Sequence, residues 1–117
     1  RLGYCRPIFL DDVAVEYPDL TIIMAHPAWP WHEEMLAIIG HKSNVFMDLS
    51  GWSPKYIPKA IMDEARSRLQ DRILFGSDYP FITPERWLND FDKLEGFTPE
   101  VRRKILHDNA ARILKRL

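Results

Sequence analysis

Three short apolar segments, each followed by a stretch with helical periodicity, constrain the fold of this chain more than any other feature. The segments are residues 20–25, 45–47 and 73–75. The first, Leu20-Thr21-Ile22-Ile23-Met24-Ala25, shows no alternation of polar and apolar residues, which is typical of a strand buried on both faces of a parallel sheet. Strands that alternate with helices are joined by crossover connections, which make neighbouring strands parallel. The sequence therefore predicts an α/β fold with a parallel sheet.

Helices are predicted before, between and after these strands from apolar spacing and from terminal signals. The expected ranges are 10–17, 30–40, 57–69 and 83–94. Thr83 and Thr98 each precede a proline and a glutamate, which is the pattern of a helix N-cap, a first helical residue and an acidic first turn. Asn109 is predicted to cap a last helix that carries Ile113, Leu114 and Leu117. The resulting order is α-βα-βα-βα-α-α.

The number of strands makes a complete barrel impossible within this chain. A (β/α)8 barrel needs roughly 250 residues, whereas the chain has 117. A free three-stranded sheet would expose two strand edges, and the chain opens with Arg1 instead of methionine. No low-complexity linker divides the sequence. We therefore expect one unit over residues 1–117 that is a fragment of a larger fold.

Charge, hydropathy and cysteine content exclude several classes of partner. The formal net charge is −1, so the chain has no basic field that would attract nucleic acid. No apolar run approaches the length of about 20 residues that a membrane span requires. Cys5 is the single cysteine, which rules out an internal disulfide and is typical of a reducing compartment. We expect a cytoplasmic protein that acts on a small molecule.

Polar side chains follow each predicted strand, where parallel α/β folds gather their functional groups. His26 ends the first strand, Asp48 the second and Asp78 the third. A carboxylate can ligate a divalent cation, and an imidazole can act as a general acid or base. Other roles fit the spacing too. His26 could be a hydrogen-bonded structural group, Asp78 could begin a helix, and Asp48 is expected to cap the turn that follows it.

Aromatic residues near the same strand ends are candidates for a substrate pocket. Trp29, Trp52 and Tyr79 could line a site for an aromatic or acyl group. Trp31 belongs to an apolar helical stripe and is expected to be core instead. No glycine-rich phosphate loop and no serine nucleophile elbow is present.

Three motifs, taken in order, resemble the last third of the amidohydrolase-related family, which includes aminocarboxymuconate semialdehyde decarboxylase. They are residues 22–31 (IIMAHPAWPW), 73–81 (ILFGSDYPF) and 108–114 (DNAARIL). The resemblance covers essentially the whole chain, and the Gly-Ser-Asp-Tyr-Pro segment after an apolar strand is its most specific part. It implies that the chain is the C-terminal part of a (β/α)8 TIM barrel and contains strands six, seven and eight.

The resemblance also assigns roles to individual residues. In that family the histidine that ends strand six is a catalytic acid or base, and this position is His26. The aspartate that ends strand eight is a catalytic metal ligand, and this position is Asp78. Asn109 matches a structural position of the terminal helix. The family's other ligands, a His-x-His pair after strand one and a histidine after strand five, are not in this chain. A divalent metal, with zinc favoured, is therefore implied with an incomplete ligand set.

The function implied by the resemblance is metal-dependent hydrolysis of a small carboxylated, aromatic or acyl substrate. The metal would activate water and His26 would move a proton. Decarboxylation or hydration by the same kind of site is the first alternative, because a fold does not choose its chemistry. We expect this chain alone to be inactive without the missing N-terminal strands. The remaining alternatives are a non-catalytic half-barrel that forms a homo-oligomer or binds a protein partner, and a small doubly wound binding domain.

Overall fold

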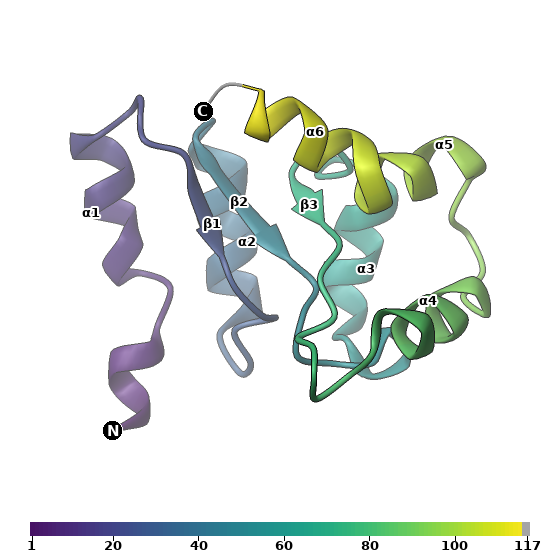
Figure 1. Cartoon of the computed structure of the whole chain (residues 1–117). Helices are drawn as coiled ribbons and strands as arrows, with labels where there is room; N and C mark the ends of the chain where they lie inside the picture. Colours follow the sequence, from purple (N-terminus) through teal and green to yellow (C-terminus); the bar gives the residue numbers. More distant parts are fainter. Residues whose placement is uncertain (116–117) are drawn as a thin grey trace.

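The computed structural model describes residues 1–115 and contains one parallel sheet with helices on both sides (Figure 1). The strands are β1 (Ile22–Met24), β2 (Val45–Asp48) and β3 (Ile73–Leu74), and their order in the sheet is β1-β2-β3. Both pairs are parallel, with Met24 beside Met47 and Asp48 beside Leu74. The predicted α/β class with three parallel strands is confirmed, and all three strands end at the same edge of the sheet.

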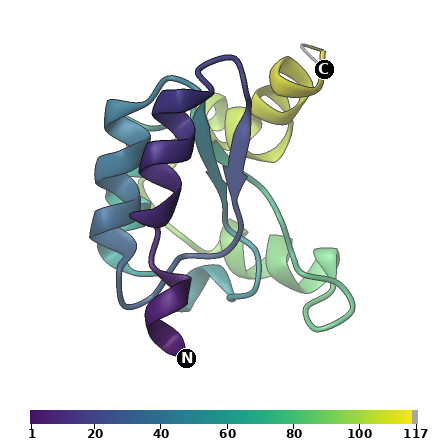
Figure 2. The same ribbon diagram turned by 90° about the vertical axis from the view of Figure 1, so that its left-hand side faces the viewer.

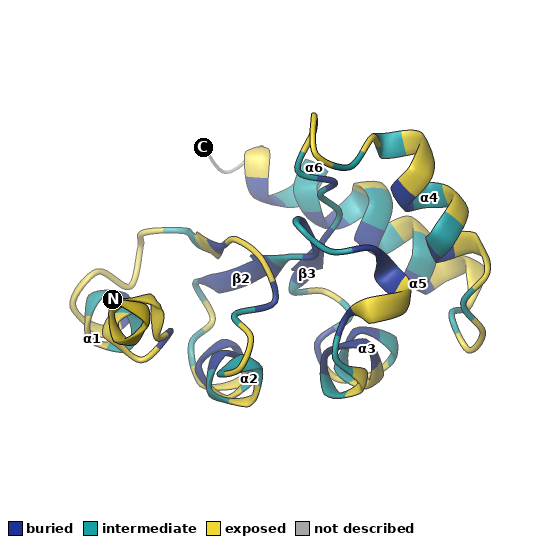
Figure 3. Cartoon of the chain, turned by 90° about the horizontal axis from the view of Figure 1, so that it is seen from below, coloured by how far each residue is buried: buried dark blue, intermediate teal, exposed yellow. Residues whose placement is uncertain are grey.

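Three helices lie in a row along one face of the sheet (Figure 3): α1 (Phe9–Glu16), α2 (His32–His41) and α3 (Lys59–Arg66). The short 3₁₀ helices η1 (Leu2–Cys5) and η2 (Pro54–Tyr56) precede α1 and α3. The helices turn their apolar stripes toward the sheet, where their buried residues meet those of the strands, as expected for amphipathic helices. The shared buried residues include Ala14, Met35, Ile39, Val45, Met47, Ile61, Ala65 and Ile73.

The chain after β3 crosses to the other side of the sheet (Figure 2). It forms α4 (Pro84–Asp92), α5 (Pro99–Arg103), the π-helical segment η3 (Lys104–Asp108) and α6 (Asn109–Leu114). The two threonine caps are confirmed, since the Oγ1 atoms of Thr83 and Thr98 accept hydrogen bonds from the backbone N–H groups of Arg86 and Val101, both at 3.2 Å. The predicted Leu117 of the last helix lies outside the described residues.

Asn109 does not cap the last helix, contrary to the sequence prediction. Its backbone and that of Asp108 are helical, so α5, η3 and α6 form one continuous helix. The Asn109 side chain is completely buried. Its Nδ2 donates to the carbonyl oxygens of Gln70 and Ile73, both at 2.8 Å. The residue therefore fastens the terminal helix to the start of β3, which agrees with the structural role that the resemblance implied.

The prediction that the first strand is buried on both faces is wrong. Ile23 in β1 is 44% exposed and Leu20 before it is 50% exposed. In contrast, all three apolar residues of β2 are buried. β1 forms an edge of this sheet, so nothing in the described chain covers the side of the strand that faces away from the helices. β2 lies between two neighbouring strands, and it is this strand, for which the sequence predicted no such burial, that is buried on both faces.

The described residues contain no helix that is both long enough and apolar enough to cross a membrane. Their only cysteine, Cys5, is exposed in η1 and has a free thiol.

Candidate active site

The backbone adopts an unusual conformation at both predicted catalytic residues. His26 and Asp78 each have a φ of 70°, and Ala28 has a φ of 55°. These three are the non-glycine residues with positive φ in the described part of the chain. The left-handed region is sterically costly for a residue with a Cβ and is enriched at functional sites. The chain therefore holds His26 and Asp78 in a strained conformation in the loops that follow β1 and β3.

A hydrogen-bond network joins the ends of β1 and β2. Asp48 Oδ1 accepts from the backbone N–H of His26 at 3.1 Å and from that of Ser50 at 3.0 Å. It also accepts from Ser50 Oγ at 2.5 Å, and Ser50 Oγ lies 2.8 Å from His26 Nδ1. Asp48 thus holds the turn after β2, as the sequence predicts, and additionally fixes the backbone and the ring of His26. Ser50 was not among the predicted site residues, although the Asp-x-Ser spacing after a strand would have indicated it.

Two glycines leave the space in which this network forms. A Cβ on Gly51 would lie 2.6 Å from His26 Nδ1, and the φ of Gly51 is 81°. A Cβ on Gly76 would lie 2.9 Å from the Cβ of Ser50. Contacts below 3.0 Å cannot be accommodated without movement. The imidazole of His26 therefore packs directly on the backbone of Gly51, while the loop after β3 packs on Ser50.

Replacing Gly51 with alanine is expected to lower the free energy of unfolding by about 1–2 kcal/mol, because a side chain is strained at positive φ. It should also displace the His26 ring from Ser50, which a crystal structure of the variant would show. Gly40→Ala is the matched control, since a Cβ on Gly40 meets nothing within 4 Å. In the helix α2 that change should stabilise the protein by about 0.5–1 kcal/mol. Equal effects of the two substitutions would contradict the packing of His26 on Gly51.

Asp78 lies in a tight turn after β3. Its backbone carbonyl accepts from the N–H groups of Phe81 at 3.0 Å and Ile82 at 3.4 Å. The alternative that Asp78 begins a helix is wrong, because α4 starts six residues later at Pro84. The Asp78 carboxylate is half-buried and forms no hydrogen bond or ion pair with another residue of the described chain, His26 included. Its oxygens are therefore available to a ligand.

The described residues contain no group of three or more histidine, cysteine, aspartate or glutamate side chains arranged to hold a metal ion. Catalytic zinc sites usually take three protein ligands and leave one position open. An unpaired carboxylate such as Asp78 fits one of these positions, since ionised oxygen is a normal ligand for divalent cations. The other ligands of a metal site would have to come from outside these residues.

The three predicted pocket residues have different surroundings. Trp29 is 61% exposed and Tyr79 is 72% exposed. Trp52 is half-buried and packs against the hydrophobic core. Phe81, which was not among the predicted pocket residues, is 84% exposed two residues after Tyr79. The loops after β1 and β3 thus present uncovered aromatic side chains.

The helix α4 anchors the loop that follows β2. Trp87 is fully buried, and its Nε1 donates to the carbonyl oxygen of Leu49 at 3.3 Å. Ser53 Oγ donates to Asp90 Oδ2 at 2.7 Å, and this bond lowers the pKa of the Asp90 carboxyl below its usual value. Because Leu49 and Ser53 flank Ser50 and Gly51, α4 helps to fix the loop on which His26 rests.

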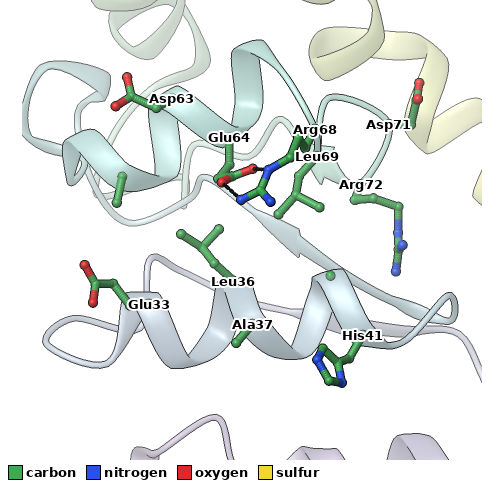
Figure 4. A pocket seen from close by; sticks show the side chains of 12 residues that line it. Glu33, Leu36, Ala37, His41, Asp63, Glu64, Arg68, Leu69, Asp71 and Arg72 are labelled. Atoms are coloured by element: carbon green, nitrogen blue, oxygen red, sulfur yellow. Dashed lines mark hydrogen bonds and ion pairs between the residues drawn. The ribbon is translucent and has the colours of Figure 1, made fainter.

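A groove of about 950 Å³ lies elsewhere, between α2 and α3 (Figure 4). Leu36 and Leu69 form its apolar part, and Glu64 pairs with Arg68 at its wall. None of the predicted site residues lines this groove. The groove lies among the helices on one side of the sheet and contains none of the strand-end residues. Its large volume is therefore no reason to place the active site there.

Comparison with known proteins places the chain in a family. The amidohydrolase family matches residues 3–116. The structure resembles that of an uncharacterized TIM-barrel protein, Bb4693, from Bordetella bronchiseptica, with a TM-score of 0.89 and 30% sequence identity. The match covers 99% of this chain and 41% of that protein, so the chain spans less than half of its structural relative and corresponds to part of a barrel. A comparison with curated proteins found no match. The chain belongs to the amidohydrolase family, and its three parallel strands with their helices form part of a TIM barrel.

Proposed function

We propose that this chain supplies the proton-transfer residue and one metal ligand of a metal-dependent hydrolase of the amidohydrolase superfamily. The observation that carries the proposal is that His26 and Asp78 follow parallel strands at one edge of the sheet, both with a φ of 70°. Strained backbone at strand ends is a feature of active sites, where surrounding contacts maintain it. For His26 those contacts are the Asp48–Ser50 network and Gly51, and for Asp78 they are the backbone hydrogen bonds from Phe81 and Ile82.

His26 is the proposed general acid and base. Its ring is exposed on one side, while Nδ1 is held by Ser50 on the other. An imidazole changes its charge near neutral pH and can therefore both accept and donate a proton during one reaction. In hydrolysis, His26 would take a proton from the attacking water and return it to the leaving group.

Asp78 is the proposed metal ligand. The amidohydrolase family generally uses divalent metals, and the half-buried Asp78 carboxylate has no partner among the described residues that would compete with a cation. When bound, the metal, for which we favour zinc, would polarise the substrate oxygen and make water more acidic. Asp48 is not proposed as a ligand, because its Oδ1 already accepts three hydrogen bonds.

The open edge of β1 supports the proposal that further barrel strands complete the site. Ile23 and Leu20 expose apolar surface there, and the structural relative extends well beyond the matched part. A strand paired with β1 would satisfy the unpaired backbone groups of its edge, and closure of the barrel would bury the face of the sheet on which Ile23 lies. We therefore propose that the remaining ligands and the pocket opposite Trp29 and Tyr79 belong to the preceding strands of the barrel.

The substrate proposed is a small carboxylated, aromatic or acyl compound, and the exposed Trp29, Tyr79 and Phe81 favour one with an aromatic or apolar part. Decarboxylation or hydration by the same residues is the alternative chemistry. The residues of this chain serve both, since His26 would then donate its proton to the carbon or oxygen that gains electron density.

Asp78→Asn tests the metal-ligand role. In a protein that carries the complete barrel, we expect the affinity for the metal to fall by at least about 10–100-fold, since even the partners that only support a metal ligand have effects of this size. Less metal should therefore remain bound after dialysis. Elemental analysis of the purified protein measures it. Asp48→Asn is the matched control and should retain the metal, because Asp48 already serves the loop through three hydrogen bonds to its Oδ1. Full metal retention in Asp78→Asn would exclude the ligand role.

A further inference from the structure

We propose that Ser50, itself held by Asp48, is a positioning residue that keeps a proton on Nδ1 of His26, so that Nε2 is the nitrogen that gives and takes protons. The catalytic meaning of this inference rests on the function proposed above. The tautomer itself depends only on the hydrogen bonds of this chain.

The number of available protons decides the direction of each bond. A serine hydroxyl has one proton to donate, and an ionised carboxylate only accepts. Ser50 Oγ lies 2.5 Å from Asp48 Oδ1, a distance typical of a hydroxyl that donates to a carboxylate. Its single proton is therefore used on Asp48. The contact of 2.8 Å between Ser50 Oγ and His26 Nδ1 then requires that Nδ1 carries the proton and donates it.

The backbone supports the same orientation of the ring. Asp48 Oδ1 also accepts from the N–H of His26 at 3.1 Å, so one carboxylate oxygen fixes both the main chain and, through Ser50, the side chain. Gly51 packs beneath the ring on the Nδ1 side, where an added Cβ would lie 2.6 Å from Nδ1 and 2.9 Å from Cε1. The Nδ1 side of the ring is therefore enclosed by this chain.

The Nδ1 bond persists in both protonation states of His26. Neutral histidine with the proton on Nδ1 donates to Ser50, and so does the imidazolium, which carries protons on both nitrogens. Proton exchange at Nε2 thus leaves the network unchanged. The ring can therefore act as base and then as acid at Nε2 without reorientation. A histidine that exchanged between its two tautomers would carry its proton on Nε2 part of the time and could not act as a base there.

Nitrogen NMR of the protein that contains these 117 residues tests the inference without metal or substrate. A long-range proton–nitrogen correlation spectrum, recorded at a pH where titration of the same signals shows neutral rings, distinguishes the two nitrogens of each histidine. His26→Gln identifies the His26 signals. We expect the chemical shift of a protonated nitrogen at Nδ1 and of an unprotonated nitrogen at Nε2. A protonated Nε2 and an unprotonated Nδ1 would overturn the proposal. This measurement needs no Ser50 variant, so the test holds even if none of those variants folds.

Ser50→Ala should shift the ratio of the two tautomers toward the Nε2-protonated form by about tenfold, the effect of losing one hydrogen bond to a polarised acceptor. Ser50→Thr retains the hydroxyl and should restore the original tautomer. Ser67→Ala is the control, because it also removes one serine hydroxyl hydrogen bond, to the carbonyl oxygen of Asp63 in α3, which does not involve the loop under His26. An unchanged His26 tautomer in folded Ser50→Ala would show that Ser50 does not position the ring.

The outcomes separate this inference from the proposed function. If Nδ1 carries the proton and Ser50→Ala removes the preference, the inference stands even when a complete barrel with His26→Gln turns over normally, and the proposed function alone fails. If the protonated nitrogen is Nε2, the inference fails while the roles of His26 and Asp78 are tested independently by turnover and metal content.

Discussion

Replacing His26 with glutamine in a protein that carries the complete barrel is expected to lower kcat by about 10²–10⁴-fold, the usual contribution of a general acid or base. Glutamine keeps a polar side chain of similar length that can still contact Ser50, but it cannot exchange a proton near neutral pH. The loss therefore reports proton transfer more directly than a loss caused by truncation to alanine would.

The division of the effect between kcat and KM makes this prediction specific. A residue that acts only in the transition state lowers kcat and kcat/KM equally and leaves KM nearly unchanged. His41→Gln is the matched control, because His41 is an exposed histidine at the end of α2. It should change neither quantity. Turnover of His26→Gln within a few-fold of the parent protein would remove His26 from the mechanism.

The architecture was predictable because apolar runs and helical stripes follow local rules. The three parallel strands, the threonine caps and the order of elements all depend on spacing along the chain. The exposure of Ile23 was not predictable in this way, since burial depends on what lies beside an edge strand. The π-helical segment Lys104–Asp108 was also missed, because its irregular bonding accompanies a tertiary contact in which the N–H of Phe75 donates to the carbonyl of Ile105 at 2.8 Å.

The candidate site shows the same limit. His26, Asp48 and Asp78 could be selected from sequence because parallel strands bring their carboxyl ends to one edge. The role of Ser50 depends on the register of β2 beside β1 and on the φ of Gly51. Neither can be predicted from the spacing of residues along the chain. Asn109 illustrates the difference most clearly. Asparagine before a helix is a common cap, yet its buried amide reaches across the fold to carbonyl groups some 39 residues away.

Replacing Asn109 with alanine is expected to lower the free energy of unfolding of this chain by about 2–4 kcal/mol. The substitution leaves the carbonyl groups of Gln70 and Ile73 without their donor, and an unsatisfied buried group costs about 1–3 kcal/mol. It also opens a small cavity beneath a fully buried position. Urea unfolding followed by circular dichroism measures the change, which should appear in the midpoint with an unchanged slope.

Two further variants distinguish this cause from a general effect of the substitution. Asn89→Ala changes an exposed asparagine in α4 and should alter stability by no more than about 0.5 kcal/mol. Asn109→Asp keeps the shape but places an oxygen, which cannot donate, against two carbonyl oxygens, so it should destabilise at least as much as alanine. If Asn109→Ala behaved like Asn89→Ala, the amide would not be what fastens α6 to β3. The packing of Ile113 against Phe46 and Leu74 would then have to hold the terminal helix in place.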